Sequence, residues 1–404
     1  MTLHLLVLWM ALVGAVRLDL SGGALPVVLS PYLVLTPLVI GALVTRRLMQ
    51  ARPVRIEWSA LGYLLLVSLF FTAVGASTFV SVDADATLAR GALLVLQFGG
   101  ATAVALLLHD DEPAVDALRR GAMLGVAVFA VLDVMAVLAF LGVLPEELSL
   151  LGATLRLDSY GYAGIIPRLS GAAIDPNNAA LLLLVYAYLA PRTRALAVLL
   201  LLATLSRSGV LAALAVGAVS AWQFGVAHRR ISAVRALAVV AVAVLTLGLA
   251  VRSSTLLETA GRMAAPFAER IGLGEGEGSA SDHQALIVRA ADEGSRSLTR
   301  AALGVGWGAA YVVLQDMFPG NRYGNFHSLY GTAFAEAGVV AFVVVLLLFF
   351  LPLGRATPWR PAVAGFIVFN MFYQATTEPV FWLLLALAWV VGDRARGASP
   401  GVAA

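Results

Sequence analysis

Long apolar blocks recur along the whole chain of 404 residues, and they constrain the fold more than any other feature. About twenty apolar residues make a helix long enough to cross a bilayer. We count about twelve such blocks, some of them short. They begin near Leu3, Leu25, Ser59, Leu88, Gly121, Asn178, Ala195, Val210, Ala236, Leu329, Pro361 and Pro379. The sequence therefore predicts an all-α polytopic membrane protein with about 12 transmembrane helices.

The composition excludes the main alternatives to this class. Hydrophobic residues make up 60% of the chain and charged residues only 13%, against roughly 25% charged residues in soluble domains. A soluble chain of this length could not bury so much apolar surface, and disorder requires the opposite composition. A transmembrane β-barrel alternates apolar and polar residues, whereas this chain does not. Cysteine is absent, so disulfides and thiolate metal sites are excluded, and no nucleic-acid partner is expected from a net charge of +3.

The arginines predict the orientation in the membrane. All 27 basic residues are arginines. One set of short connections between blocks carries fifteen of them, and the alternate short connections carry about five. The positive-inside rule places the richer set in the cytoplasm, together with both termini. We therefore expect a multi-pass protein of the bacterial inner membrane whose working face is periplasmic.

Two connections on the outer side are long, and they divide the chain into three regions. Residues 1–251 hold the first nine predicted helices and an outer loop over about 145–177. Residues 252–326 form a large periplasmic loop, and residues 327–404 hold the last three helices. Long loops are translocated regardless of their charge, so the arginines of these loops do not violate the rule.

The large loop contains two helical patterns. Apolar residues recur at helical spacing between Leu256 and Ile271, which predicts an amphipathic helix lying on the membrane. A second helix is predicted over Asp282–Ala302. Arg289, Arg296 and Arg300 share one face of it. That face is either solvated, with pairs such as Arg289–Glu293, or a clamp on a pyrophosphate, which arginine binds bidentately.

Two polar motifs stand at the outer ends of apolar blocks. Arg207 lies in SRSG, where it is either a snorkelling arginine at a helix end or a functional charge. Asp175, Pro176, Asn177 and Asn178 form DPNN at the start of a block. This motif is either an ordinary helix cap or, with Asn177 and Asn178 as substrate ligands, the floor of a polar pocket beside Arg207.

His327 and Glu336 mark the point where the large loop re-enters the membrane. An uncharged imidazole can accept a proton from a hydroxyl, so His327 is either a general base or an interfacial histidine. Glu336 lies nine residues further on, within an apolar run. A carboxylate in such a run is a candidate site residue, and it could orient a polar group or pair with an arginine.

Other acidic residues are weaker candidates. Asp83 and Asp85 form a short DxD motif that could hold a divalent metal, although a solvated turn explains them as well. The run from His109 to Glu112, followed by Pro113, indicates a helix start. Asp133 stands alone in an apolar block, and no pattern explains it. We expect no metal and no cofactor.

Taken together, four motifs resemble the O-antigen ligase and O-antigen polymerase family of bacterial membrane glycosyltransferases. They are DPNNAA at Asp175–Ala180, SRSG at Ser206–Gly209, GVGWG at Gly304–Gly308 and HSLYGTAFAEAG at His327–Gly338. Their order matches the family, and they cover roughly the C-terminal half of the chain. The serine after His327 departs from the asparagine common in the family.

The resemblance implies a GT-C-like helical fold, and a glycan donor carried on undecaprenyl diphosphate in the outer leaflet. It implies that Arg207 and a loop arginine, here Arg289, hold the pyrophosphate, and that His327 is the base on the acceptor hydroxyl. The family's loop arginine usually lies further upstream of the glycine motif. The expected acceptor is a lipid A core sugar, as in a ligase, or a second lipid-linked glycan, as in a polymerase. The expected enzyme is an inverting, metal-independent glycosyltransferase.

Three other readings stay open. About twelve spans is a number typical of secondary transporters, but the two halves of this chain look unlike each other. A metal-dependent GT-C enzyme would use Asp83 and Asp85. A lipid-binding scaffold without catalysis would tolerate replacement of His327.

Overall fold

The computed structural model describes residues 1–21, 30–51, 57–108, 110–150, 152–157, 160–162, 166–173, 175–228, 278–321, 324–355 and 357–390. Within this part, five helical segments are long and apolar enough to cross a membrane. They are α2 (Pro31–Met49), α3 (Trp58–Ser77) with its 3-10 extension η1 (Thr78–Val80), the segment α4 (Ala84–Leu94), η2 (Val95–Gly99) and α5 (Gly100–Leu108), α6 (Glu112–Phe140), and α15 (Leu329–Leu353). These five segments are consistent with the predicted all-α membrane protein.

Further helices occupy other predicted blocks. The shorter apolar ones are α1 (Thr2–Leu12), α7 (Pro176–Leu189), α16 (Arg360–Phe372) and α17 (Pro379–Val390). Two more are α8 (Arg194–Ala203) and α9 (Arg207–His228). The block near Ala236 lies outside the described residues. At 1.5 Å per residue, the 14 residues of α7 and the 10 of α8 cover about 21 and 15 Å, less than the roughly 30 Å of a bilayer core. The number of about twelve spans therefore stays a prediction.

Short strands correct the expectation that the chain is purely helical. β1 (Leu18–Asp19), β2 (Glu147–Leu150) and β3 (Ala153–Arg156) form an antiparallel sheet in the order β1-β3-β2, with Leu148 opposite Leu155. β4 (Tyr160–Tyr162) pairs with β5 (Ile166–Arg168). Four of these strands lie in the predicted outer loop. Gly152, at φ +82° between β2 and β3, permits their tight turn.

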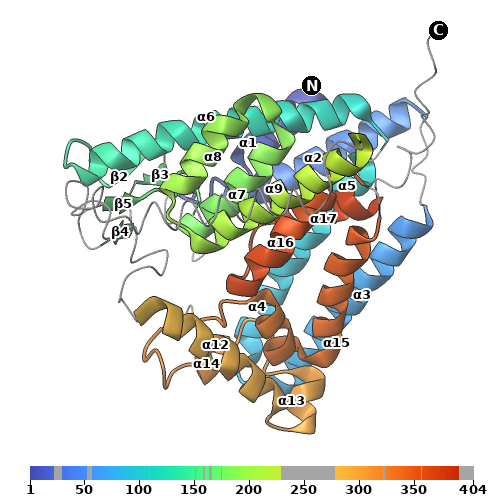
Figure 1. Cartoon of the computed structure of the whole chain (residues 1–404), viewed down its shortest axis with the longest axis vertical. Helices are drawn as coiled ribbons and strands as arrows, with labels where there is room; N and C mark the ends of the chain where they lie inside the picture. The colour runs from blue at the N-terminus through green and yellow to red at the C-terminus, as the bar shows by residue number, and fades with distance from the viewer. Residues whose placement is uncertain are drawn as a thin grey trace.

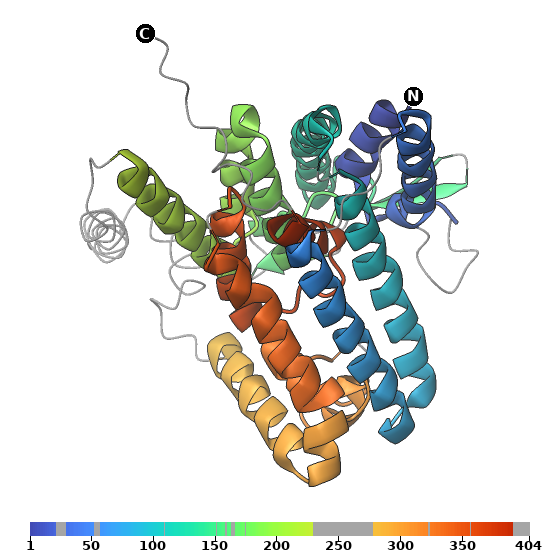
Figure 2. The ribbon, with the colours of Figure 1, turned by 90° about the vertical axis from the view of Figure 1, so that its right-hand side faces the viewer.

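The helices form two groups in space. α6 and α1 pack together along the top of Figure 1, while α3, α4 and α15 run downwards from this level. Figure 2 shows α3 and α15 side by side, with α12 against the other side of α15. An aromatic cluster between α3, η2 and α17 fills the centre, where Phe98 stacks on Trp382 at 3.9 Å between ring centroids. The core is therefore built from the first quarter and the end of the chain together.

Burial differs sharply between long and short helices. About a third of the α2, α3 and α6 windows is buried, which suits helices that face lipid. In α7, by contrast, 12 of 14 residues are buried, and every residue of α17 is buried. These two helices are enclosed by protein, so their polar ends are held in fixed surroundings.

The large loop is described only in its second part, so the predicted amphipathic helix at Leu256–Ile271 and the domain boundary at residue 251 lie outside the described residues. Instead of one helix over Asp282–Ala302, the structure has α12 (Gly278–Ser295) and α13 (Leu298–Leu303), followed by α14 (Ala310–Val313). The break arises because the Ser297 hydroxyl accepts the Arg300 N–H at 3.1 Å and caps α13. A small apolar core, including Leu286, Leu314 and Phe326, holds this region against α15.

Candidate functional site

The α7–α8 hairpin brings the DPNN and SRSG motifs together. Asp175 caps α7 by accepting the N–H groups of Asn177 and Asn178 at 2.7 and 3.1 Å. The chain then reverses, so that the residues after α8 return to the start of α7. The Ser206 hydroxyl donates to Asn177 Oδ1 at 2.9 Å, across 29 residues of sequence. Arg207 is the first residue of α9 and therefore begins its helix at this same place.

His327 joins the same cluster through Tyr373. The rings of His327 and Tyr373 meet edge to face with centroids 6.0 Å apart, and the Tyr373 hydroxyl donates a short hydrogen bond to Asp175 Oδ2. His327 has φ +51°, a left-handed conformation that costs a residue with a side chain about 1–3 kcal/mol. Its N–H donates to Asn325 Oδ1 at 2.8 Å, which helps to hold this backbone.

Glu378 is a second carboxyl group at the cluster. Its side chain is buried just before α17, and within the described residues its Oε2 has no hydrogen-bond partner. Burial, together with the neighbouring negative charge of Asp175, raises the pKa of Glu378 well above its ordinary value. The site therefore favours the neutral form of Glu378.

Four described helices begin at this cluster. Asp175 precedes α7, Arg207 opens α9, His327 and Ser328 precede α15, and Glu378 precedes α17. Each helix N-terminus carries a partial positive charge of about half an elementary charge. The Asp175 carboxylate already caps the start of α7, so an anion at the cluster would have to bind at Arg207 and at the other helix starts. We call this group of residues (Asp175, Asn177, Ser206, Arg207, His327, Tyr373 and Glu378) the site cluster.

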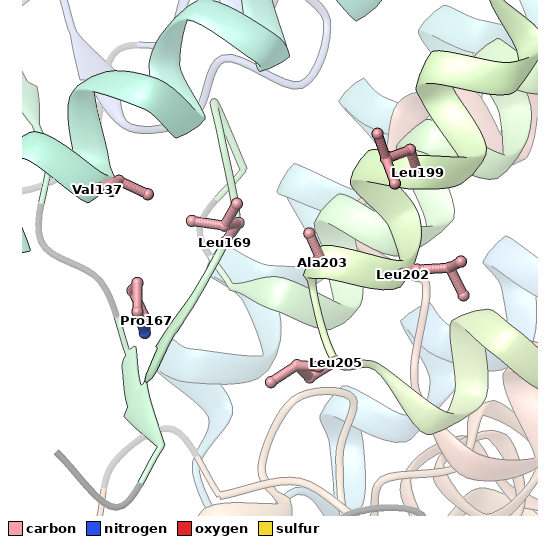
Figure 3. A pocket seen from close by; sticks show the side chains of 7 residues that line it. All are labelled: Val137, Pro167, Leu169, Leu199, Leu202, Ala203 and Leu205. Atoms are coloured by element: carbon pink, nitrogen blue, oxygen red, sulfur yellow. The ribbon is translucent and has the colours of Figure 1, made fainter. Parts of the chain in front are cut away.

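An apolar groove begins two residues before Arg207. It has a volume of about 520 Å³ and only apolar lining residues, contributed by α6, β5 and the segment after it, α8 and Leu205. Figure 3 shows Leu199, Leu202 and Ala203 on α8 at one side of the groove, and Pro167, Leu169 and Val137 at the other. Arg168, between Pro167 and Leu169, donates from Nε to the Thr204 carbonyl at 3.2 Å and ties the two sides together.

Glu336 links the GVGWG motif to α15. Its carboxylate accepts the N–H groups of Gly308 and Ala310 at 2.7 and 3.1 Å. The helix is interrupted at Gly338, whose φ of +81° only glycine adopts easily. A Cβ there would collide with the Ala302 carbonyl, and one on Gly304 would collide with the Glu336 backbone. Glu336 therefore fixes a close contact between two motifs far apart in sequence.

The loop arginines form ion pairs on the α12 side of the molecule. Arg289 pairs with Asp316 at 3.0 Å and with Glu293 at 3.3 Å, and Arg296 pairs with Glu293 at 3.1 Å. Arg300 donates to the Gly304 carbonyl at 3.4 Å. In this conformation the three side chains are engaged within the loop and with the GVGWG motif, so their predicted contact with a pyrophosphate stays a prediction.

The remaining acidic candidates have local partners. Asp83 caps α4 by accepting the Ala86 N–H at 3.0 Å and also accepts from the Tyr311 hydroxyl, and this second bond holds the pKa of Asp83 below its usual value. Asp111 caps α6, as the helix-start interpretation expected. Among the described residues, no group of three histidine or acidic side chains could hold a metal ion.

Asp133, unexplained by the sequence, fixes the loop before α7. Its carboxylate accepts the Gly171 N–H at 2.7 Å, and Arg17 donates from Nε to the Ala173 carbonyl at 2.8 Å. These bonds tie the loop to α6 and to the segment after α1, just before Asp175 at the start of α7.

Sequence reasoning missed Tyr373 and Glu378. The signal was present, because YQATTEP is a polar run of the same kind as DPNN directly before an apolar block. A scan against protein-family models and a search of curated proteins both find no match to this chain.

Proposed function

We propose that this protein transfers a glycan from a polyprenyl diphosphate, such as undecaprenyl diphosphate, to an acceptor hydroxyl at the outer face of the inner membrane. The observation that carries the proposal is the convergence of Arg207, His327 and four helix N-termini on one cluster. A cation and aligned helix ends suit a diphosphate, and a neighbouring imidazole suits an attacking hydroxyl.

The reaction requires the protein to stabilise the leaving group and to accept a proton from the acceptor. Displacing a diphosphate from a sugar carbon leaves negative charge on the leaving group, and fixed positive groups stabilise that charge. The acceptor hydroxyl must also lose its proton to a base within hydrogen-bond reach. In this proposal Arg207 stabilises the leaving diphosphate, and His327 is the base. Attack from the side opposite the diphosphate inverts the anomeric carbon, and the reaction as written uses no metal.

The donor's lipid has a suitable place beside the cluster. The apolar groove in Figure 3 ends at Leu205, two residues from Arg207. A polyprenyl chain in this groove would put its diphosphate beside the start of α9. The groove thereby supports a lipid-linked donor over a water-soluble nucleotide sugar.

The other predicted site residues take supporting roles in the proposal. Asn177 and Asn178 line the diphosphate side, next to Ser206. Arg289, Arg296 and Arg300 guide the donor's charged part from the loop, and Glu336 holds the GVGWG backbone. The proposed acceptor is a lipid A core sugar, and a second lipid-linked glycan is the alternative.

Reconstitution tests this proposal directly. Purified protein in liposomes receives undecaprenyl-diphosphate-linked glycan and either a lipid A core acceptor or more of the same donor, with and without EDTA. Transfer to the core that survives EDTA supports a metal-independent ligase, whereas chain extension supports a polymerase. Absence of transfer to any acceptor, while the donor is bound, contradicts the proposal. In cells, gene deletion should leave long polymer on the lipid carrier for a ligase, and single repeat units at the surface for a polymerase.

A second candidate function is secondary transport, which α7 and α8 favour. Both are too short to cross a bilayer, and the hairpin they form ends at a polar cluster, as in transporters built from broken helices. Uptake of labelled glycan precursor into protein-containing liposomes, without covalent transfer, would select this candidate.

A further inference from the structure

A second cavity lies next to the site cluster, and several polar side chains line it together with Leu93, Leu94 and Trp307. It has a volume of about 280 Å³ and lies between α4, η2, the GVGWG segment, α15 and the segment before α17. Its lining includes Arg90, Gln97, Asn325, Gln374, Thr376 and Trp307. Small-molecule pockets of about 300 Å³ and upwards combine apolar walls with a few fixed polar groups. This cavity has room for one ring-sized ligand and not for a longer chain.

The backbone around the cavity is irregular in two places. Gln97 lies in the π-helical turn η2, and such turns are frequently found at functional sites. The Tyr32 hydroxyl donates to the Gln97 carbonyl at 3.1 Å and supports the turn. On the opposite wall, α15 is broken at Gly338, two residues after the cavity-lining Glu336. Two interrupted helices facing one polar cavity indicate a binding site rather than a packing defect.

The polar groups of the cavity are held in place. The Thr332 hydroxyl donates to Gln374 Oε1 at 2.8 Å, and Gln374 Nε2 donates to Thr376 at 3.0 Å. Arg90 donates to the Gly308 carbonyl and lies over the Tyr311 ring, 5.2 Å from its centroid. Fixed groups of this kind bind a ligand without losing side-chain freedom.

The charges and polar groups of the lining limit the kind of ligand that the cavity can bind. The lining contains one guanidinium, of Arg90, and one carboxylate, of Glu336, so its formal charges balance. Its other polar groups are carboxamides and hydroxyls, which both donate and accept hydrogen bonds. Such a lining suits a neutral, hydroxyl-rich ring, whereas the site cluster suits an anion.

The position of the cavity next to His327 indicates that its ligand is the acceptor and not the donor. Asn325, in the lining, accepts the His327 N–H at 2.8 Å. Gln374, also in the lining, follows Tyr373, whose ring meets the His327 ring. We propose that this cavity is the subsite for the acceptor's terminal sugar ring, which places the attacking hydroxyl beside His327. The inference rests on the proposed glycan transfer.

Gln97→Ala tests the subsite, with Leu96→Ala as a matched control. Both residues lie in the same π-helical turn, but Leu96 is 60% exposed and does not line the cavity. Loss of one or two neutral hydrogen bonds should raise the KM for the acceptor about five- to ten-fold. The donor KM and the melting temperature should stay unchanged. Leu96→Ala should leave both KM values unchanged.

A rise in the donor KM alone, or no change in either KM, would overturn the assignment. Direct binding separates this inference from the proposed function. Oligosaccharides released from the host's own surface glycans serve as probes in saturation-transfer NMR with the full-length protein. Binding that Gln97→Ala weakens and Leu96→Ala retains supports a sugar subsite even if the wild-type protein transfers nothing. Equal signals from wild type and Gln97→Ala overturn it, even if transfer is observed.

Discussion

Two groups of charged residues in this molecule are built on opposite plans. At the junction of α2 with α6, Arg46 pairs with Asp111 at 2.9 Å, and Arg47 forms a short ion pair with Asp110. We call these four residues the clamp. In the site cluster, by contrast, the Asp175 carboxylate accepts from two backbone N–H groups and the Tyr373 hydroxyl, and among the described residues it forms no ion pair.

This difference suggests that the charges of the clamp stabilise the fold, whereas those of the site cluster serve its function. In the clamp each cation meets a carboxylate, so removing one partner leaves the other partly buried and uncompensated. In the site cluster the Asp175 carboxylate is held by two N–H groups at the start of α7 and by the Tyr373 hydroxyl, so Asp175 caps a helix instead of pairing with a cation. This comparison predicts that clamp variants lose stability and keep activity, while variants at Arg207 and His327 lose activity and keep stability.

The largest expected effect is the loss of transfer in His327→Ala and Arg207→Ala. Removing a general base lowers kcat about 10²- to 10⁴-fold, and removing one charge stabiliser lowers it about 10²- to 10³-fold. Initial rates with a lipid-linked donor measure both effects, and melting curves in detergent should match the wild type. A His327→Ala variant with full activity would show that His327 is not the general base. An Arg207→Ala variant that loses melting temperature instead of rate would place Arg207 with the clamp.

Arg47→Gln should produce the opposite pattern. Arg47 is buried and also donates from Nε to the Leu107 carbonyl at 2.9 Å, so loss of its charged hydrogen bonds should cost about 1.5–3 kcal/mol in free energy of unfolding. The rate per folded molecule should not change. Arg119→Gln is the matched control, because its pair with Asp116 is more than half exposed on both sides and contributes about 0–1 kcal/mol. Equal stability losses in the two variants would refute the clamp.

The sequence predicted the members of the site cluster that interrupt apolar blocks, namely Asp175, Asn177, Arg207 and His327, because a polar residue in such a setting is conspicuous. It also predicted the helical class. It could not predict the contact of Ser206 with Asn177, which depends on the reversal of the chain between α7 and α8. The partner of Asp133 is a backbone N–H supplied by tertiary structure alone.

The strands and the polar cavity were also beyond sequence reasoning. The strands β2 to β5 are short and paired, and their hydrogen bonds depend on the partner strand more than on any repeating sequence pattern. Gln97 stands in VLQFG, a sequence that fits an ordinary helix, and only the structure shows its π-helical turn. Such features arise from packing, which leaves no periodic signal in the chain.

Glu378 should make the stability of the folded protein depend on pH. Its folded-state pKa is raised, whereas the unfolded value is about 4.3. The folded state therefore binds the proton more tightly, and this contribution to stability is complete below the unfolded pKa. It is lost as the pH rises toward the folded value, with a slope of up to about 1.4 kcal/mol per pH unit. The pKa of Asp83 is lowered instead, so any effect of Asp83 on stability falls at more acidic pH.

Melting curves of wild type and Glu378→Gln between pH 4 and pH 9 measure this contribution, because the amide mimics the neutral carboxyl at every pH. The wild type should lose stability relative to Glu378→Gln as the pH rises. A constant difference across the range would show that Glu378 is ionised in the folded protein.

Tyr373→Phe should have the smallest effect, and it tests whether neutral donors are what holds the site cluster. The substitution removes the hydroxyl bound to Asp175 but keeps the ring beside His327, and the two backbone donors to Asp175 remain. One such bond contributes about 1 kcal/mol, so kcat should fall about five-fold, with little change in melting temperature. Tyr330→Phe is the matched control, since its hydroxyl donates to the Ile367 carbonyl at 3.2 Å, outside the cluster. If both variants kept full rate while Tyr373→Phe melted earlier, the Tyr373–Asp175 contact would stabilise the fold as the clamp does, and the distinction between the two groups of charges would fail at this residue.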